Sequence, residues 1–231
     1  INGKPLFLDD HLERLVKSSQ ILNVSLWYDK AQIAEFISDL CKRNDITNGN
    51  IKLMFGFNSS ENFFIAYQSK HLYPTPLMYQ EGVATATISV VRQNPNAKNF
   101  QPFKSVTESF IKDKGIYEAI LIDKQQHVTE GSKSNIFFIK DKEIITALPS
   151  DVLLGITRKY VIDVCKSIGF TISERKISFA ELPEFDAAFI SGTSPKILPI
   201  KSINDIVFDV KKKFPHELMF KFDELIMLQI Q

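Results

Sequence analysis

The stretch from Tyr117 to Asn135, YEAILIDKQQHVTEGSKSN, constrains this chain more than any other feature of its sequence. The apolar run Ala119–Ile122 predicts a strand that leads into a polar turn, and a second apolar run, Ile136–Ile139, predicts another strand. Glu130 lies between the two runs and is followed by glycine and small hydroxyl residues. Burying a carboxylate there for packing alone is costly, so we expect Glu130 to meet a buried positive charge.

The composition is that of an ordinary globular protein with a formal net charge of +1, which argues against a dedicated nucleic-acid binder. There is no apolar run of 18 residues and no visible signal peptide, so we expect no membrane span and a cytoplasmic location. Cys41 and Cys165 each fall on the apolar stripe of a predicted helix and are expected to be free thiols. No metal site is predicted.

The order of the predicted elements indicates an α+β chain of two domains. Two amphipathic helices, the first opening at an expected capping box at Asp10–Glu13, precede a hairpin with its turn at Asn58–Ser60. The alternate prolines of Tyr73–Pro76 predict a stiff extended linker. We therefore assign residues 1–72 to a small α+β domain, residues 73–82 to a linker and residues 83–231 to a larger, β-rich domain.

Four motifs together resemble those of class IV aminotransferases. They are Lys98, the TEGSKSN stretch at 129–135, Gly155-Ile156-Thr157 and Ser191-Gly192-Thr193. That family consists of pyridoxal-phosphate (PLP) enzymes and includes branched-chain and D-amino-acid aminotransferases and aminodeoxychorismate lyase. The resemblance covers nearly the whole chain and implies the two-domain, D-amino-acid aminotransferase-like fold of fold type IV. It also implies a homodimer, because active sites in the family borrow residues from the partner subunit.

The resemblance gives Lys98 the role of the lysine that forms a Schiff base with PLP and then shuttles the substrate proton. Lys98 precedes Glu130 by 32 positions, close to the family spacing, and ends an Asn-Pro-Asn-Ala turn. Two alternatives stay open. The first alternative is that Lys98 is an ordinary surface lysine. The second is that Lys104, six residues further on, is the reactive amine.

Glu130 is implied to hold a proton on the ring nitrogen of PLP, with Ser132 and Asn135 of the same stretch also binding the cofactor. A carboxylate about 4 Å from that nitrogen, at an effective dielectric near 20, supplies roughly 4 kcal/mol, or about three pKa units. That is enough to keep the ring protonated near neutral pH. The alternative is a solvent-facing glutamate in a hairpin.

Two loops of small residues are expected to bind the cofactor phosphate. Gly155-Ile156-Thr157 opens a predicted helix, whose free N–H groups and dipole favour an anion. The resemblance assigns phosphate contacts to Ile156, Thr157 and Thr193, and close backbone approach to Gly192. Arg14 matches a family arginine that reaches the same phosphate, the alternative being an exposed helix residue. Arg92 lies near a second arginine that some members use.

Three departures from the family pattern bear on function. Family members have a strand before the segment that matches Gly3–Phe7, and here it is absent naturally, by truncation or through disorder. D-amino-acid aminotransferases carry a carboxylate-binding arginine where this chain has Phe55, which removes the main support for D-specificity. Lys133 replaces a serine, and it either adds charge near the cofactor or points outward.

The resemblance thus implies a PLP-dependent aminotransferase that moves an amino group from an amino acid to a 2-oxo acid through Lys98. One alternative on the same fold is a lyase that acts on aminodeoxychorismate by β-elimination. Another is a homologue that binds PLP without turnover.

Overall fold

The computed structural model describes residues 1–57, 61–70 and 73–230, so the turn predicted at Asn58–Ser60 lies outside the described residues. The chain divides into two compact units, Ile1–Tyr73 with Leu225–Gln231, and Pro74–Glu224. The boundary between Glu224 and Leu225 falls inside the last helix, so Leu225–Gln231 groups with the N-terminal unit. The sequence had indicated that this segment belongs to the larger domain. Among the described residues, no helix has the length and apolar run needed to cross a membrane.

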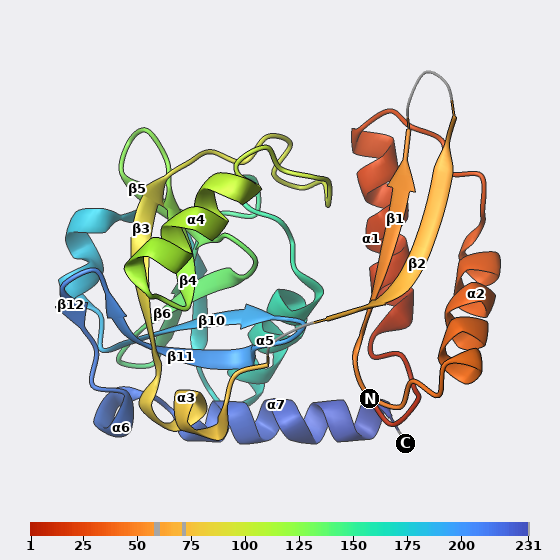
Figure 1. Ribbon diagram of the computed structural model, residues 1–231. Helices are drawn as coiled ribbons and strands as arrows, with labels where there is room; N and C mark the ends of the chain where they lie inside the picture. The colour runs from red at the N-terminus through yellow and green to blue at the C-terminus, as the bar shows by residue number, and fades with distance from the viewer. Residues whose placement is uncertain (58–60, 71–72, 231) are drawn as a thin grey trace. The chain divides into compact units, whose positions relative to one another are not determined.

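The small unit contains two helices and a hairpin: α1 (Leu8–Ile21), α2 (Lys30–Arg43), β1 (Asn50–Gly56) and β2 (Phe63–Ser69). The strands are antiparallel, with Asn50 opposite Ser69 and Gly56 opposite Phe63. Leu12 of α1 and Ile33 of α2 belong to one buried cluster, and partly buried β1 side chains such as Leu53 pack against it. Both helices therefore cover the same face of the hairpin (Figure 1).

The start of α1 differs from the predicted capping box. The helix begins at Leu8, after Phe7 in the left-handed region (φ 52°), and Asp10 lies in its first turn. There its carboxylate interacts favourably with the helix dipole and does not cap the end. The capping box occurs instead at α2, where the Asp29 carboxylate accepts the Gln32 N–H at 2.9 Å and Gln32 Oε1 accepts the Asp29 N–H at 3.0 Å.

The large unit is built on one sheet whose strands follow the order β8-β7-β6-β10-β11-β3-β4-β5-β9, with β12 paired to β11. The β11–β3, β3–β4 and β7–β8 pairs are parallel and the remaining pairs are antiparallel. The strands are β3 (Val83–Ser89), β4 (Glu118–Ile122), β5 (His127–Gly131), β6 (Asn135–Lys140), β7 (Glu143–Thr146), β8 (Thr171–Glu174), β9 (Ile177–Ser178), β10 (Ala187–Gly192), β11 (Lys196–Ile203) and β12 (Ile206–Val207).

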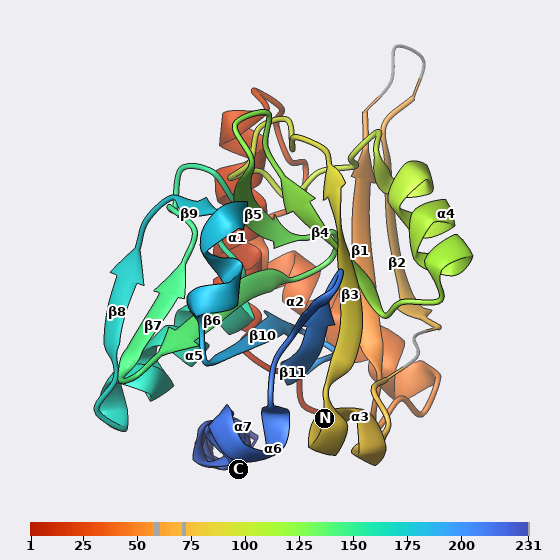
Figure 2. The same cartoon turned by 90° about the vertical axis from the view of Figure 1, so that its left-hand side faces the viewer.

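Figure 2 shows that this sheet is strongly curled, and one apolar cluster joins side chains from strands across it. Ile145 of β7 and Ile177 of β9, from opposite ends of the strand order, belong to the same cluster as Ile120 and Ile190 of the central strands. Strands β7 and β9 were not predicted, because four-residue and two-residue segments give little periodic signal. The sheet places the turn before β6 beside the turn after β10, although the two are distant in sequence.

The helices of this unit precede, connect or follow its strands along the chain. Pro76 was predicted to be part of an extended linker, but it opens α3, because Thr75 caps the helix and accepts the Met78 N–H at 3.3 Å. Gly115, in the left-handed region, is the C-cap of the helix that ends at Lys114. The helices are α3 (Pro76–Glu81), α4 (Lys104–Lys114), α5 (Ile156–Ser167), a 3₁₀ helix (Phe179–Glu184), α6 (Val210–Lys213) and α7 (His216–Gln229).

Candidate active site

Glu130 lies in an irregular part of β5. Ile122 of β4 pairs with Val128, and Ile120 pairs with Gly131, so three steps along β5 match two steps along β4. This extra residue is a β-bulge, a feature that redirects side chains and recurs beside active sites. The bulge places Glu130 where only 2% of its side chain is exposed.

The carboxylate of Glu130 has partners from two distant segments. Oε1 accepts a hydrogen bond from Nε of Arg92, whose side chain is itself only 7% exposed, and the two form a buried ion pair. Oε2 accepts the backbone N–H of Leu153 at 3.2 Å. Glu130 therefore does meet the buried positive charge expected from the sequence, and that charge is Arg92.

Burial raises the pKa of Glu130 above its ordinary value, while the charges of Arg92 and, more weakly, Lys98 act in the opposite direction. A buried carboxylate with a raised pKa binds a shared proton more strongly than an exposed one.

Lys98 lies in the loop between β3 and α4, which is held against the segment preceding α5. The Nδ2 of Asn96 donates to the carbonyl oxygens of Pro149 and Val152, both at 2.8 Å. The neighbouring Ala97 is fully buried, whereas Lys98 is exposed. The backbone on the N-terminal side of Lys98 is therefore anchored, and its side chain extends from that anchored turn.

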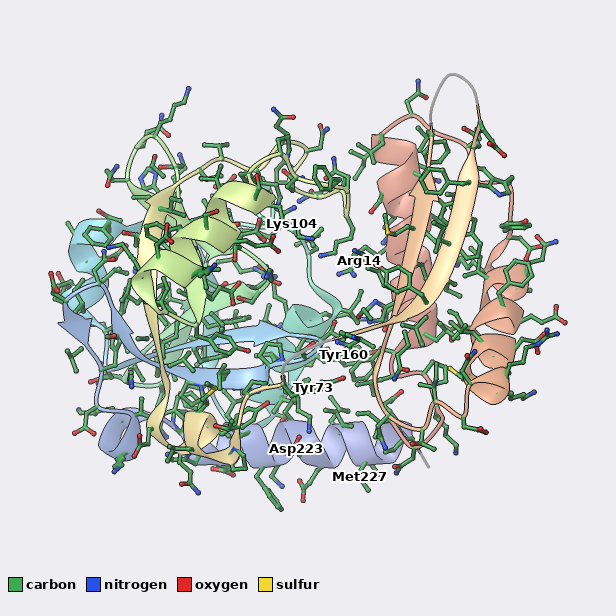
Figure 3. All side chains as sticks on the ribbon, in the orientation of Figure 1. Arg14, Tyr73, Lys104, Tyr160, Asp223 and Met227 are labelled. Atoms are coloured by element: carbon green, nitrogen blue, oxygen red, sulfur yellow. The ribbon has the colours of Figure 1, made fainter. Side chains whose placement is uncertain are left out.

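Lys104, the alternative amine, begins α4 (Figure 3) and lies near Glu108, with Nζ 3.9 Å from Oε1 across the exposed helix surface. Nζ of Lys133 approaches the same Glu108 oxygen at 3.5 Å, and its side chain is more than half exposed. Of the two roles considered for Lys133, the outward one therefore agrees with this contact.

Asn135, at the start of β6, organises the approach to α5. Its Nδ2 donates to the carbonyl oxygen of Leu153 at 2.8 Å. A Cβ at Gly155 would collide with Asn135 Oδ1, so only glycine fits at this N-cap position without a shift. Among the described residues no side chain caps α5, which leaves N–H groups of its first turn available to an anion. Ile156 and Thr157, in that turn, are both buried.

The Ser191-Gly192-Thr193 motif lies near Asn135 because two neighbouring strands of the sheet pair there. Ser191 of β10 pairs with Asn135 of β6, so the turn that begins at Gly192 lies beside the end of the TEGSKSN stretch. A Cβ at Gly192 would lie 3.7 Å from the Lys133 carbonyl oxygen and 3.2 Å from Pro195. Thr193 is exposed on this turn. The hydroxyl of Ser191 is buried and has no hydrogen-bond partner among the described residues.

Ser132 has a partner that the sequence did not indicate. Its hydroxyl donates to Oε1 of Glu118 at 3.4 Å, and Glu118 is almost fully buried at the start of β4. The signal available in the sequence was an acid directly before the apolar run Ala119–Ile122.

Two predicted residues belong to the small unit. Arg14 lies on α1, and its contact with a phosphate stays a prediction. Phe55 lies on β1 and packs against Trp27 and Phe64, with ring centroids 5.0 and 4.6 Å apart. Phe55, expected to stand where D-amino-acid aminotransferases carry an arginine, is therefore part of an aromatic cluster.

The Amino-transferase class IV family matches residues 1–203 of this chain. The chain belongs to the class IV aminotransferases. It is accordingly an enzyme of a PLP-dependent family, and the predictions of family, fold type, enzymatic activity and cofactor are confirmed.

Two curated proteins and one solved structure show what this chain is similar to. A probable branched-chain-amino-acid aminotransferase from Rickettsia bellii is 28% identical over 216 residues, which are 88% of this chain and 75% of that protein. A D-alanine aminotransferase from Listeria monocytogenes is 28% identical over 239 residues, covering 93% of this chain and 79% of that protein. The crystal structure of a putative 4-amino-4-deoxychorismate lyase from Legionella pneumophila has the same fold, with a TM-score of 0.85 at 20% identity, and the match covers 96% of this class IV aminotransferase and 87% of that chain.

Proposed function

We propose that Lys98 and Glu130 are the catalytic residues of this aminotransferase, which moves an amino group from an amino acid to a 2-oxo acid. The observation that carries this proposal is that one short segment binds both residues' surroundings: Val152 accepts the Asn96 Nδ2 at 2.8 Å, two residues before Lys98, and Leu153 donates its N–H to Glu130 Oε2 at 3.2 Å. The other cofactor-binding residues in this proposal are Arg14, Ser132, Asn135, Gly155, Ile156, Thr157, Gly192 and Thr193.

The residues of the site fit PLP. A carboxylate oxygen accepts more than one hydrogen bond, so Oε2 of Glu130 retains capacity for the N–H of the cofactor ring beside its bond from Leu153. The uncapped first turn of α5 offers backbone N–H groups to the phosphate. The buried Ser191 hydroxyl, unpaired within the described part of the chain, provides a further polar group next to Gly192.

When bound, PLP supplies an electron sink for the bond that breaks at the substrate α-carbon. Lys98 is the amine that bonds the cofactor, and as a neutral amine its Nζ then takes up and returns the α-carbon proton. Glu130 holds a proton at the ring nitrogen, and Arg92 fixes the orientation of that carboxylate.

Transfer of an amino group tests this function directly. The protein is incubated with PLP, a panel of amino acids and a 2-oxo acid acceptor, and the new amino acid is measured. We expect product formation that requires the acceptor, and none with the Lys98→Ala variant. PLP binding without transfer to any acceptor would contradict the proposed function and favour a homologue that binds PLP without turnover.

The second candidate reaction is the β-elimination lyase activity, and the structural neighbour from Legionella pneumophila is the observation that favours it. The same lysine and glutamate would serve both reactions. The two differ in their products, because elimination from aminodeoxychorismate releases pyruvate without an amino acceptor. If pyruvate is released in the absence of a 2-oxo acid, the assigned reaction is β-elimination and not transamination.

The proposal includes a homodimer. Its support in this chain is the outer face of the β1–β2 hairpin, where Met54, Phe63 and Ile65 are each more than a third exposed. Contiguous exposed apolar side chains of this kind mark interaction surfaces. Light scattering after gel filtration is expected to give twice the chain mass for the wild type and a monomer for Ile65→Lys. A monomeric wild type would contradict this part of the proposal.

A cytoplasmic location is also part of the proposal. It is supported by the two cysteines, Cys41 and Cys165, which are both free. Free thiols are typical of a reducing compartment. Fractionation of cells that produce the protein tests this location, and its recovery outside the cytoplasm would contradict it.

A further inference from the structure

A second buried carboxylate lies directly beneath the TEGSKSN turn. Glu118, at the first position of β4, is 4% exposed and accepts hydrogen bonds from three groups of that turn. Oε1 accepts the backbone N–H of Lys133 at 2.6 Å and the hydroxyl of Ser132 at 3.4 Å, and Oε2 accepts the hydroxyl of Ser134 at 2.9 Å.

Glu118 also explains why glycine follows Glu130. A Cβ at Gly131 would lie 2.6 Å from Glu118 Oε1 and would collide with the Ser134 hydroxyl. The space that a side chain would need at position 131 is therefore filled by the Glu118 carboxylate and one of its donors. Three residues of the motif, Gly131, Ser132 and Ser134, are thus fitted around this one acid.

The turn that Glu118 binds separates two residues of the proposed site. Glu130 precedes it in the β5 bulge, and Asn135 follows it at the start of β6. The turn is closed by the Gly131 N–H on the Ser134 carbonyl oxygen at 2.8 Å, and it is attached to β4 by the Ser132 N–H on the Ala119 carbonyl oxygen at 2.9 Å. The Glu118 carboxylate adds three hydrogen bonds between the turn and β4, from the Lys133 N–H and the hydroxyls of Ser132 and Ser134.

Packing alone does not account for an acid at this position. Burial raises the pKa of Glu118, and the bonds from Lys133, Ser134 and Ser132 lower it. An unpaired buried carboxylate is costly, whereas one that accepts three hydrogen bonds fixes the groups that supply them. The strand side chains that follow Glu118 are all apolar.

We propose that Glu118 is a positioning residue of the active site, whose carboxylate holds the 131–134 turn and so sets the positions of Glu130 and Asn135 relative to the cofactor. Glu118 itself does not touch the reacting atoms in this proposal. The inference rests on the proposed function, because it assigns Glu118 a role toward the PLP that Glu130 and Asn135 bind.

The test compares Glu118→Ala, Glu118→Gln and Ser134→Ala with a matched control, Glu108→Gln. Glu108 is also a carboxylate beside Lys133, but it is exposed and approaches the side-chain Nζ, whereas Glu118 binds the backbone N–H. Three quantities are measured: the dissociation constant of PLP from the reconstituted apo protein, the pH midpoint of the visible absorbance of bound PLP, and the melting temperature of the apo protein.

We expect Glu118→Ala to raise the PLP dissociation constant by about tenfold or more, because the groups of the turn lose their buried acceptor. The pH midpoint of the bound cofactor should shift in the same variant, because Glu130 is displaced. Glu118→Gln keeps an acceptor for the Lys133 N–H and should stay within about threefold of the wild type. Glu108→Gln should not differ from the wild type.

A folded Glu118→Ala variant with unchanged dissociation constant and pH midpoint would overturn the inference, even if its melting temperature falls. If that variant does not fold, Ser134→Ala decides, since it removes one donor and leaves the other two. We then expect a PLP dissociation constant raised by about threefold, and an unchanged value would overturn the inference. A wild type that binds no PLP would instead refute the proposed function.

Discussion

The guanidinium of Arg92 pairs with Oε1 of Glu130, while Oε2 of the same carboxylate accepts the Leu153 N–H at 3.2 Å. Oε1 is thus paired with the Arg92 guanidinium, and Oε2 lies beside the segment that leads into α5. Both side chains are nearly fully buried, so neither can be screened by water. The orientation of the proposed ring-nitrogen partner is therefore set by the protein before any cofactor binds.

Replacing Arg92 should affect both stability and the charge of Glu130. Arg92→Ala leaves a buried carboxylate without its cation, and such changes cost about 3–5 kcal/mol. Because Arg92 lowers the pKa of Glu130, its removal should raise that pKa further and shift Glu130 towards the protonated form near neutral pH. Urea unfolding measures the stability loss. A variant that unfolds at the wild-type urea concentration would show that the pair contributes nothing.

Glu130→Gln should retain PLP but lose rate. The amide keeps the shape of the side chain, but it lacks the charge that holds the ring proton, worth roughly 4 kcal/mol and hence between about 10²- and 10³-fold in kcat. Single-turnover kinetics with an amino acid substrate measure the effect, with the surface variant Glu108→Gln as the control. A decrease in kcat of less than about threefold would argue against this role for Glu130.

Gly155→Ala should weaken PLP binding through Asn135. The backbone at residue 155 suits any residue (φ −64°), so the cost comes from the contact between the added Cβ and Asn135 Oδ1. A double-mutant cycle separates this contact from other effects. In the Asn135→Ala background the added methyl group has no oxygen to meet, and Gly155→Ala should cost much less. Equal costs in both backgrounds would exclude this contact as the cause.

Tyr79 gives the large unit a pH dependence in the alkaline range. Burial, with a smaller contribution from the charge of Asp223, raises the pKa of Tyr79 to about 12, and its hydroxyl donates to the Pro195 carbonyl oxygen at 3.1 Å. A pKa raised on folding from the ordinary 10.0 means that this stabilisation is complete below about pH 10 and is lost as the pH rises through about 12.

Tyr79→Phe isolates this effect. At pH 8 the variant should be less stable than the wild type by about 1 kcal/mol, the usual contribution of one hydrogen bond. The difference should shrink at pH 11, because the unfolded wild type then ionises at Tyr79 and the folded protein does not. Urea unfolding of both proteins at the two pH values measures it. A difference that is equal at both pH values would contradict the assignment.

Several local motifs predicted their secondary structure correctly, although the capping box expected at Asp10–Glu13 did not form. The glycine and threonine of Gly155-Ile156-Thr157 signal a helix start, and α5 begins there. The apolar runs on either side of Glu130 predict strands, and β4 and β6 occupy them. Thr75-Pro76 carried a helix-start signal of the same kind, but the alternate prolines led to an extended interpretation, and α3 begins there instead.

The parts that the sequence did not predict depend on pairing between distant segments. The bulge at Glu130 arises from the register of β4 against β5, which no local pattern specifies. The Arg92–Glu130 pair joins residues 38 positions apart. Glu118 was visible only as an acid before an apolar run, and its role follows from the turn that the sheet places above it. Such contacts are fixed by tertiary packing, and local secondary-structure propensity does not predict them.

The most direct test of the account identifies the lysine that bonds PLP. The protein is loaded with PLP, reduced with borohydride so that the cofactor is fixed covalently, digested and mapped by mass spectrometry. The account predicts modification at Lys98, which is lost in Lys98→Ala and retained in Lys104→Ala. Modification at Lys104, or at no lysine, would contradict it.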